Sequence, residues 1–83
     1  MKIKILGKYW DLIRCSLPSD RDGDCNHPTD LAKTIRVRSS LIGKRELEVI
    51  LHELLHAADW HKDEAWVVTV ASDVAHVLWR LGY

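Results

Sequence analysis

The sequence is poor in several residue types, and each shortage excludes a class of protein. Only two cysteines, Cys15 and Cys25, occur among its 83 residues, too few for the disulfide framework of a small secreted domain. Twelve basic and twelve acidic residues cancel to a net charge of zero, so the chain lacks the positive excess of a nucleic-acid-binding protein. No apolar run is long enough for a signal-peptide core or a membrane span. We therefore expect a cytoplasmic protein that binds neither nucleic acid nor membranes.

The length and overall composition of the chain indicate one small folded domain. A chain of 83 residues has room for a single hydrophobic core, so we expect one domain over residues 1–83. Its hydrophobic content of 47% fits a packed protein and argues against disorder. Phenylalanine is absent, so the four tryptophans are expected in or beside the core. A core of this size stabilises a fold only weakly, and a bound metal ion would add to its stability.

The first half of the chain has the pattern of β-structure interrupted by a loop. Residues 2–15 alternate between apolar and polar side chains around Gly7 and Lys8, which predicts two strands joined by a tight turn. Residues 16–30 are dense in Asp, Ser, Pro and Gly, a composition typical of loops. Residues 33–40 alternate again and are predicted to form a third strand.

The second half changes to a helical period. Apolar residues recur at helical spacing over residues 44–60, and again over residues 63–81 after a short break. Strands followed by helices indicate an α+β fold. We expect an N-terminal antiparallel three-stranded sheet followed by two helices.

The first predicted helix contains the sequence H-E-L-L-H at residues 52–56. His52 and His56 lie one helical turn apart, so both rings can approach one metal ion. Glu53 lies about 100° around the helix from His52, where it can flank the ion without binding it. Residue composition alone would produce only about 0.014 such matches in a chain of this length.

The helical wheel indicates that this histidine pair lies outside the core. The apolar stripe of the helix consists of Leu47, Ile50, Leu51, Leu54 and Ala58, and both histidines fall almost opposite its centre. The main alternative to a metal site is therefore a solvated helix face rather than a pair of core histidines.

The third metal ligand is less clearly indicated, although a catalytic zinc site has three protein ligands and one position open for water. Glu64 follows His56 by eight residues and starts the second predicted helix beside its apolar face, where an unpaired carboxylate would be costly. The helix dipole is another explanation for an acidic residue there. Glu64 ranks first, His61 in the turn second, and Asp63, which also suits a helix N-cap, third. Asp59 is placed to accept a hydrogen bond from a ligand imidazole.

The H-E-L-L-H sequence resembles the motif of the zincin metallopeptidases. That resemblance implies zinc as the cofactor, His52 and His56 as its ligands, and Glu53 as the general base. The metzincin extension is missing, because Asp59 and Lys62 stand where it has a glycine and a third histidine. A glutamate ligand on the following helix, here Glu64, is similar to the gluzincin arrangement with an unusually short gap.

The order of a hairpin, an acidic loop, a strand and the histidine helix also looks like that of small metallopeptidases inferred from phage and bacterial genomes. The resemblance implies a zinc-dependent peptidase that hydrolyses peptide bonds through a metal-bound water and acts on a peptide or protein substrate. A non-catalytic, zinc-stabilised module that binds a protein partner is the alternative. Glu53 distinguishes the two, since only hydrolysis has a use for it.

Several residues outside the H-E-L-L-H sequence are candidates for contact with a substrate. In zincins a sheet edge commonly aligns the substrate, and residues 34–38 are the expected edge. Arg36 and Arg38 would then favour acidic substrates, or would protect an exposed edge against aggregation. Four side chains are candidate donors to the oxyanion that forms during hydrolysis, namely Tyr9, Arg45, His61 and Tyr83.

Overall fold

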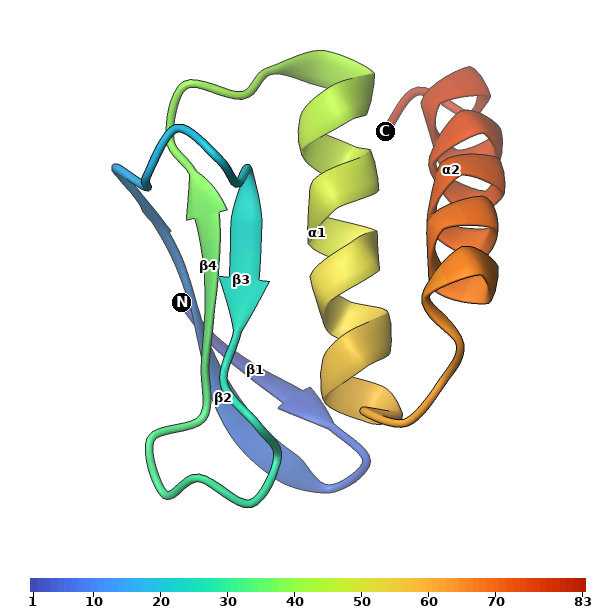
Figure 1. The fold of residues 1–83 in the computed structure, drawn as a ribbon. Coiled ribbons are helices and arrows are strands. Elements are labelled where there is room, and N and C mark those ends of the chain that lie inside the picture. The colour runs from blue at the N-terminus through green and yellow to red at the C-terminus, as the bar shows by residue number, and fades with distance from the viewer.

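The computed structural model describes all 83 residues as a four-stranded sheet and two helices (Figure 1). The elements are β1 (Lys2–Ile5), β2 (Lys8–Cys15), β3 (Gly23–Cys25), β4 (Thr34–Arg38), α1 (Gly43–Ala58) and α2 (Glu64–Arg80). The strand order in the sheet is β1-β2-β4-β3. The predicted α+β class is confirmed.

The sheet is mixed, so the expectation of three antiparallel strands is wrong in two respects. The segment predicted as a loop contributes β3, which pairs antiparallel with β4. In addition, β4 pairs with β2 in parallel, from Asp11 opposite Thr34 to Cys15 opposite Arg38. Residues 16–33 form a crossover long enough for parallel pairing, and β3 lies within it.

Local sequence does not predict this pairing, because burial decides it. Ile35 and Val37 of β4 have no exposed surface, and the centre of the sheet is the place that buries them. The three residues of β3 are too few to show an alternating pattern, and Gly23 and Asp24 have low strand propensity. Their conformation depends on β4 and α1, which lie on either side.

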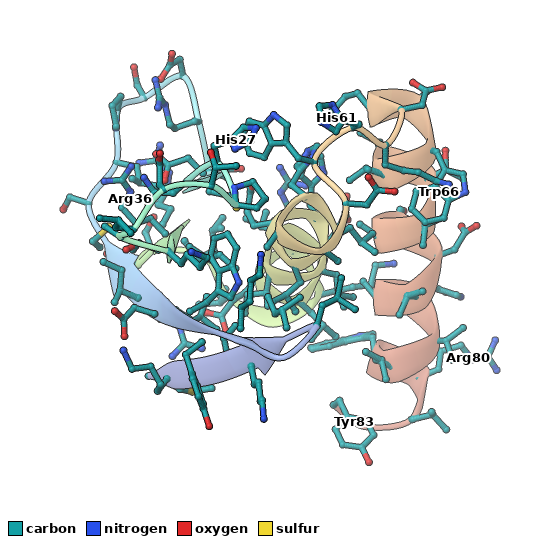
Figure 2. All side chains as sticks on the ribbon, turned by 90° about the horizontal axis from the view of Figure 1, so that it is seen from below. His27, Arg36, His61, Trp66, Arg80 and Tyr83 are labelled. Carbon is teal, nitrogen blue, oxygen red and sulfur yellow. The ribbon has the colours of Figure 1, made fainter.

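Helix α1 is the middle layer of the molecule. It packs on the sheet through Val49 and Ala57, which join Trp10, Ile35 and Val37 in the core. Helix α2 contacts α1 and no strand. Figures 1 and 2 together show that α2 crosses α1 obliquely on the side away from the sheet. The position of α2 therefore depends on α1 alone.

The helix boundaries agree with the predicted ranges to within two residues. Asp63 caps α2 as expected, because its side chain accepts a hydrogen bond of 3.1 Å from the backbone N–H of Ala65. Of the tryptophans only Trp10 is fully buried, whereas the other three are 38–48% exposed. Neither helix has the length and hydrophobicity needed to cross a membrane.

We predict that the contact between the helices depends on a narrow apolar stripe of α2. Val67 is fully buried and its neighbour Val68 is 47% exposed, so the same substitution at the two positions separates packing from helix propensity. Val67→Ala should lower the free energy of unfolding by about 2 kcal/mol, through lost burial and the cavity left behind. Val68→Ala should change it by less than about 0.5 kcal/mol. Urea denaturation measures both, and equal effects would show that α2 does not pack as described.

Candidate metal centre

Three side chains from the two helices converge on one point. His52 and His56 project from successive turns of α1, and their Nε2 atoms lie 3.0 Å apart. Glu64, in the first turn of α2, places one carboxylate oxygen 3.1 Å from His52 Nε2 and the other 2.9 Å from His56 Nε2. The structure thus brings together the three residues ranked first as ligands, and this group can hold a metal ion.

The chain connection explains why Glu64 reaches the histidines. Helix α1 ends two residues after His56, and α2 begins after only a short turn. The Asp63 cap then fixes the first turn of α2 beside the last turns of α1. Helix α2 therefore presents its first carboxylate to the histidine side of α1.

The environment of His52 favours the form of imidazole that binds a metal. Burial lowers the pKa of His52, although the neighbouring Glu64 carboxylate acts in the opposite direction. The imidazole that binds a metal is the neutral form. Two imidazoles and one carboxylate are donors that suit divalent transition metals, so the residues present fit such an ion.

Glu53 lies between the two histidines in the chain and lines the same hollow, but it does not belong to the group of candidate ligands. Its residue surface is only 7% exposed, and it has no hydrogen-bond or ion-pair partner among the side chains and backbone of the protein. Burial raises its pKa to about 7, and the nearby charges of Asp24 and Glu64 act in the same direction. A buried carboxylate without a partner destabilises a fold, so its position calls for an explanation other than packing.

A hollow of about 480 Å³ opens beside these groups. It is lined by Gly23, Asp24, Cys25, His52, Glu53, His56, Trp60, Lys62 and Glu64. A smaller hollow of about 150 Å³ adjoins it and shares Gly23, His52 and Glu53. Every side-chain oxygen that is fully buried has a hydrogen-bond partner. The Glu53 carboxylate has no partner, so it must be in contact with the hollow. A small molecule or a peptide group placed there would meet Glu53 and the three candidate ligands together.

The wall opposite α1 is the short strand β3, not the strand expected. β4 lies between β2 and β3, so the expectation that residues 34–38 form an open edge is wrong. The two arginines of β4 also form ion pairs within the protein. Arg36 binds Asp24 at 2.6 Å and Arg38 binds Asp22 at 3.1 Å. These ion pairs hold the acidic loop, and β3 within it, against the sheet.

Most of the other candidates lie away from the three ligand groups. His61 and Asp63 do not belong to the group, and Figure 2 shows His61 at the end of the molecule where α2 begins. Asp59 ends α1 through its backbone N–H and makes no hydrogen bond to either histidine. Tyr9 and Tyr83 are exposed and line neither hollow. Arg45 lines the smaller hollow, where it pairs with Asp22 and Glu48.

Sequence reasoning missed the contribution of the acidic loop to the site. Gly23, Asp24 and Cys25 line the hollow only because β3 packs against α1, and no pattern in residues 16–30 signals a strand. Trp60 also lines the hollow, and its ring packs against His27 in a tilted arrangement with centroids 4.8 Å apart.

The fold and the site together define the class of molecule, a small α+β protein with a candidate three-ligand metal centre. Protein-family models, curated proteins and solved structures were compared with the chain, and none matches it.

We predict that glycine is required at position 23 because β3 approaches α1 closely. A Cβ atom there would lie 2.8 Å from Val49 Cγ1, 3.1 Å from the Arg36 carbonyl oxygen and 3.1 Å from Glu53 Oε2. Gly23→Ala should therefore cost about 1–3 kcal/mol of stability through overpacking. Chemical denaturation of the Gly23→Ala, Val49→Ala and double variants tests this. The double variant should lose less than the two single losses combined, and strict additivity would contradict a steric conflict with Val49.

Proposed function

We propose that the protein is a zinc-dependent peptidase in which Glu53 acts as the general base. The observation that carries this proposal is the buried, partnerless carboxylate of Glu53 beside three converging metal-binding side chains. A metal site with a purely structural role has no need of that carboxylate. Hydrolysis does need it, because a base must take a proton from the attacking water.

The spacing of the three ligand atoms supports zinc. Zinc binds imidazole nitrogen and carboxylate oxygen at about 2.0–2.2 Å in tetrahedral geometry, which places neighbouring ligand atoms about 3.3 Å apart. The two Nε2 atoms lie 3.0 Å apart and each lies 2.9–3.1 Å from a different oxygen of Glu64, and one ligand atom from each residue lies within 4.8 Å of the others, so small side-chain adjustments would suffice. Three protein ligands also match the number found in catalytic zinc sites, which keep one position open.

In the proposed reaction, the residues of the chain position a peptide and move one proton. When bound, zinc lowers the pKa of water and polarises a carbonyl group. Glu53 accepts the proton of the attacking water and returns it to the departing amine. β3 is an edge strand, and its free backbone groups can pair with an extended peptide. Trp60 lines the same hollow and offers an apolar surface to a substrate side chain.

A non-catalytic, zinc-stabilised binding module is the second candidate, and one observation favours it. Helix α2 touches only α1, and Glu64 is the residue that would join the two helices through a metal. Zinc would then stabilise the fold directly, since its ligands come from both elements. The two proposed functions share the metal site. They differ in whether Glu53 takes part in a reaction. Either would act in the cytoplasm.

The metal site can be tested by zinc content. We predict that the purified protein holds about one zinc per chain and that zinc raises its melting temperature, because the ion binds only the folded state. His56→Ala and Glu64→Ala should lose the metal, whereas His61→Ala and Asp63→Asn should retain it. Elemental analysis after dialysis, with melting curves, measures this. Zinc loss in His61→Ala rather than in Glu64→Ala would disprove the assignment of the third ligand.

Catalysis can be tested separately at Glu53. We predict that the wild type cleaves members of a mixed peptide library and that Glu53→Gln lowers the rate by at least about 100-fold while zinc content stays unchanged. Glu48→Gln is a matched control, since Glu48 lies on α1 near the smaller hollow but pairs with Arg45. Mass spectrometry of the library gives the rates. Stoichiometric zinc without any cleavage by the wild type would favour the binding module.

A further inference from the structure

Helix α2 is more apolar than its position in one copy of the chain explains. Eleven of its seventeen residues are apolar, yet only Val67, Ala71 and Ala75 are buried. A helix that is apolar on most sides is ordinarily covered on most sides. In this fold α2 contacts α1 alone, so much of its apolar surface faces solvent.

The uncovered residues form a second stripe on α2. Trp66, Val70, Val74, Val77 and Leu81 follow one another at intervals of four, four, three and four residues, which places them on one side of the helix. Four of them are 39–68% exposed, and Val70 is partly buried. Figure 2 shows Trp66 on the side of α2 that faces away from α1. This surface is called the α2 stripe below.

A second open apolar surface lies between the β1–β2 hairpin and α1. It is a groove of about 1030 Å³, and twelve of its fourteen lining residues are hydrophobic. Leu51, Leu54 and Leu55 of α1 form part of its floor, and Leu6 and Ile13 form part of its hairpin wall. No residue of α2 lines it. This surface is called the hairpin groove.

The hairpin turn shows that its exposed side chain is costly to the monomer. Leu6 has a positive φ of 49° and is 80% exposed. Turn positions with positive φ ordinarily carry Asn, Asp or Gly, so leucine adds backbone strain to the cost of an exposed apolar side chain. A partner that covers Leu6 would offset part of that cost.

The exposed apolar area can be compared with what a stable interface needs. The exposed residues of the α2 stripe and the hairpin-groove rim together present on the order of 700 Å², for side-chain areas of about 150–250 Å². Stable interfaces bury about 600–1,000 Å² per partner. The two surfaces together therefore fall in the lower part of that range.

We propose that a second copy of this chain covers both surfaces. The stripe of a helix is convex and fits an apolar groove, and each copy carries one stripe and one groove. Reciprocal insertion of α2 into the hairpin groove of the other copy gives a closed two-fold dimer with two identical contacts. Lys4 is the groove-lining charge with no ion pair across to α1, since Arg14 is paired with Glu46, and Asp73 beside Val74 of the stripe could pair with it. With zero net charge, the copies do not repel each other at long range.

Neither the α2 stripe nor the hairpin groove shares a residue with the two hollows of the candidate metal centre. The oligomeric state can therefore be measured without any knowledge of the activity.

The experiment measures the mass in solution by light scattering and sedimentation, from low to high micromolar concentration. The wild type should have twice the 9.6 kDa mass of one chain. Val77→Lys in the stripe and Ile13→Glu in the groove should each be monomeric. An equimolar mixture of the two should dimerise, because one contact is then intact and the other pairs lysine with glutamate. Leu31→Lys, at a fully exposed loop position outside both surfaces, should remain dimeric.

Folding of each variant is checked by circular dichroism and by its zinc content relative to the wild type. A wild type that stays monomeric at every concentration overturns the proposal, as does a dimer that persists in both single variants. A monomer that floats with anionic vesicles would assign the groove to a membrane surface. A monomer that binds an acidic amphipathic peptide would assign it to another protein. Either result excludes the second copy as the occupant.

Discussion

The packing of α1 is the constraint on which every other feature of this molecule depends. The helix supplies Val49 and Ala57 to the core against the sheet, it is the sole support of α2, and it carries both histidines. With so few buried residues, a shift of α1 would disturb the core, the candidate metal centre and the hairpin groove together. The close approach at Gly23 fixes the distance from α1 to β3, and it thereby fixes the width of the hollow.

The candidate metal centre places two imidazoles and two carboxylates close together. The Nε2 atoms of His52 and His56 lie 3.0 Å apart, so one ring must donate a hydrogen to the other or their lone pairs repel. Glu64 faces both rings and can accept a hydrogen bond from either, and Asp24 is paired with Arg36 and Arg21. Glu53 is the carboxylate of this group that has no such partner. A divalent cation would stabilise the neutral imidazoles as ligands and the carboxylates as anions, so the arrangement suits a metal ion.

The helices and the convergence of the candidate ligands could be predicted from the sequence because their signals are local. The 3.6-residue period located both helices, and the Asp63 cap and the spacing of Glu64 from His56 placed the third carboxylate. The sheet was predicted less well, since β3 has three residues without any periodic pattern and the parallel pairing of β2 with β4 depends on the burial of Ile35 and Val37. The walls of the hollow could not be predicted for the same reason. Gly23, Asp24 and Cys25 reach it only through contacts between distant segments.

Glu64 and Glu53 would have different roles in the candidate metal centre. Glu64 would contribute to stability and Glu53 to chemistry. Glu64 is mostly exposed and lies within 3.1 Å of both histidines, so a metal there would link α2 to α1 whether or not the protein is an enzyme. Glu53 makes no such link between the two helices. It is buried and partnerless, and removing its charge would be expected to stabilise the fold. A protein that needed only a zinc staple would gain by losing this carboxylate, whereas a hydrolase could not function without it.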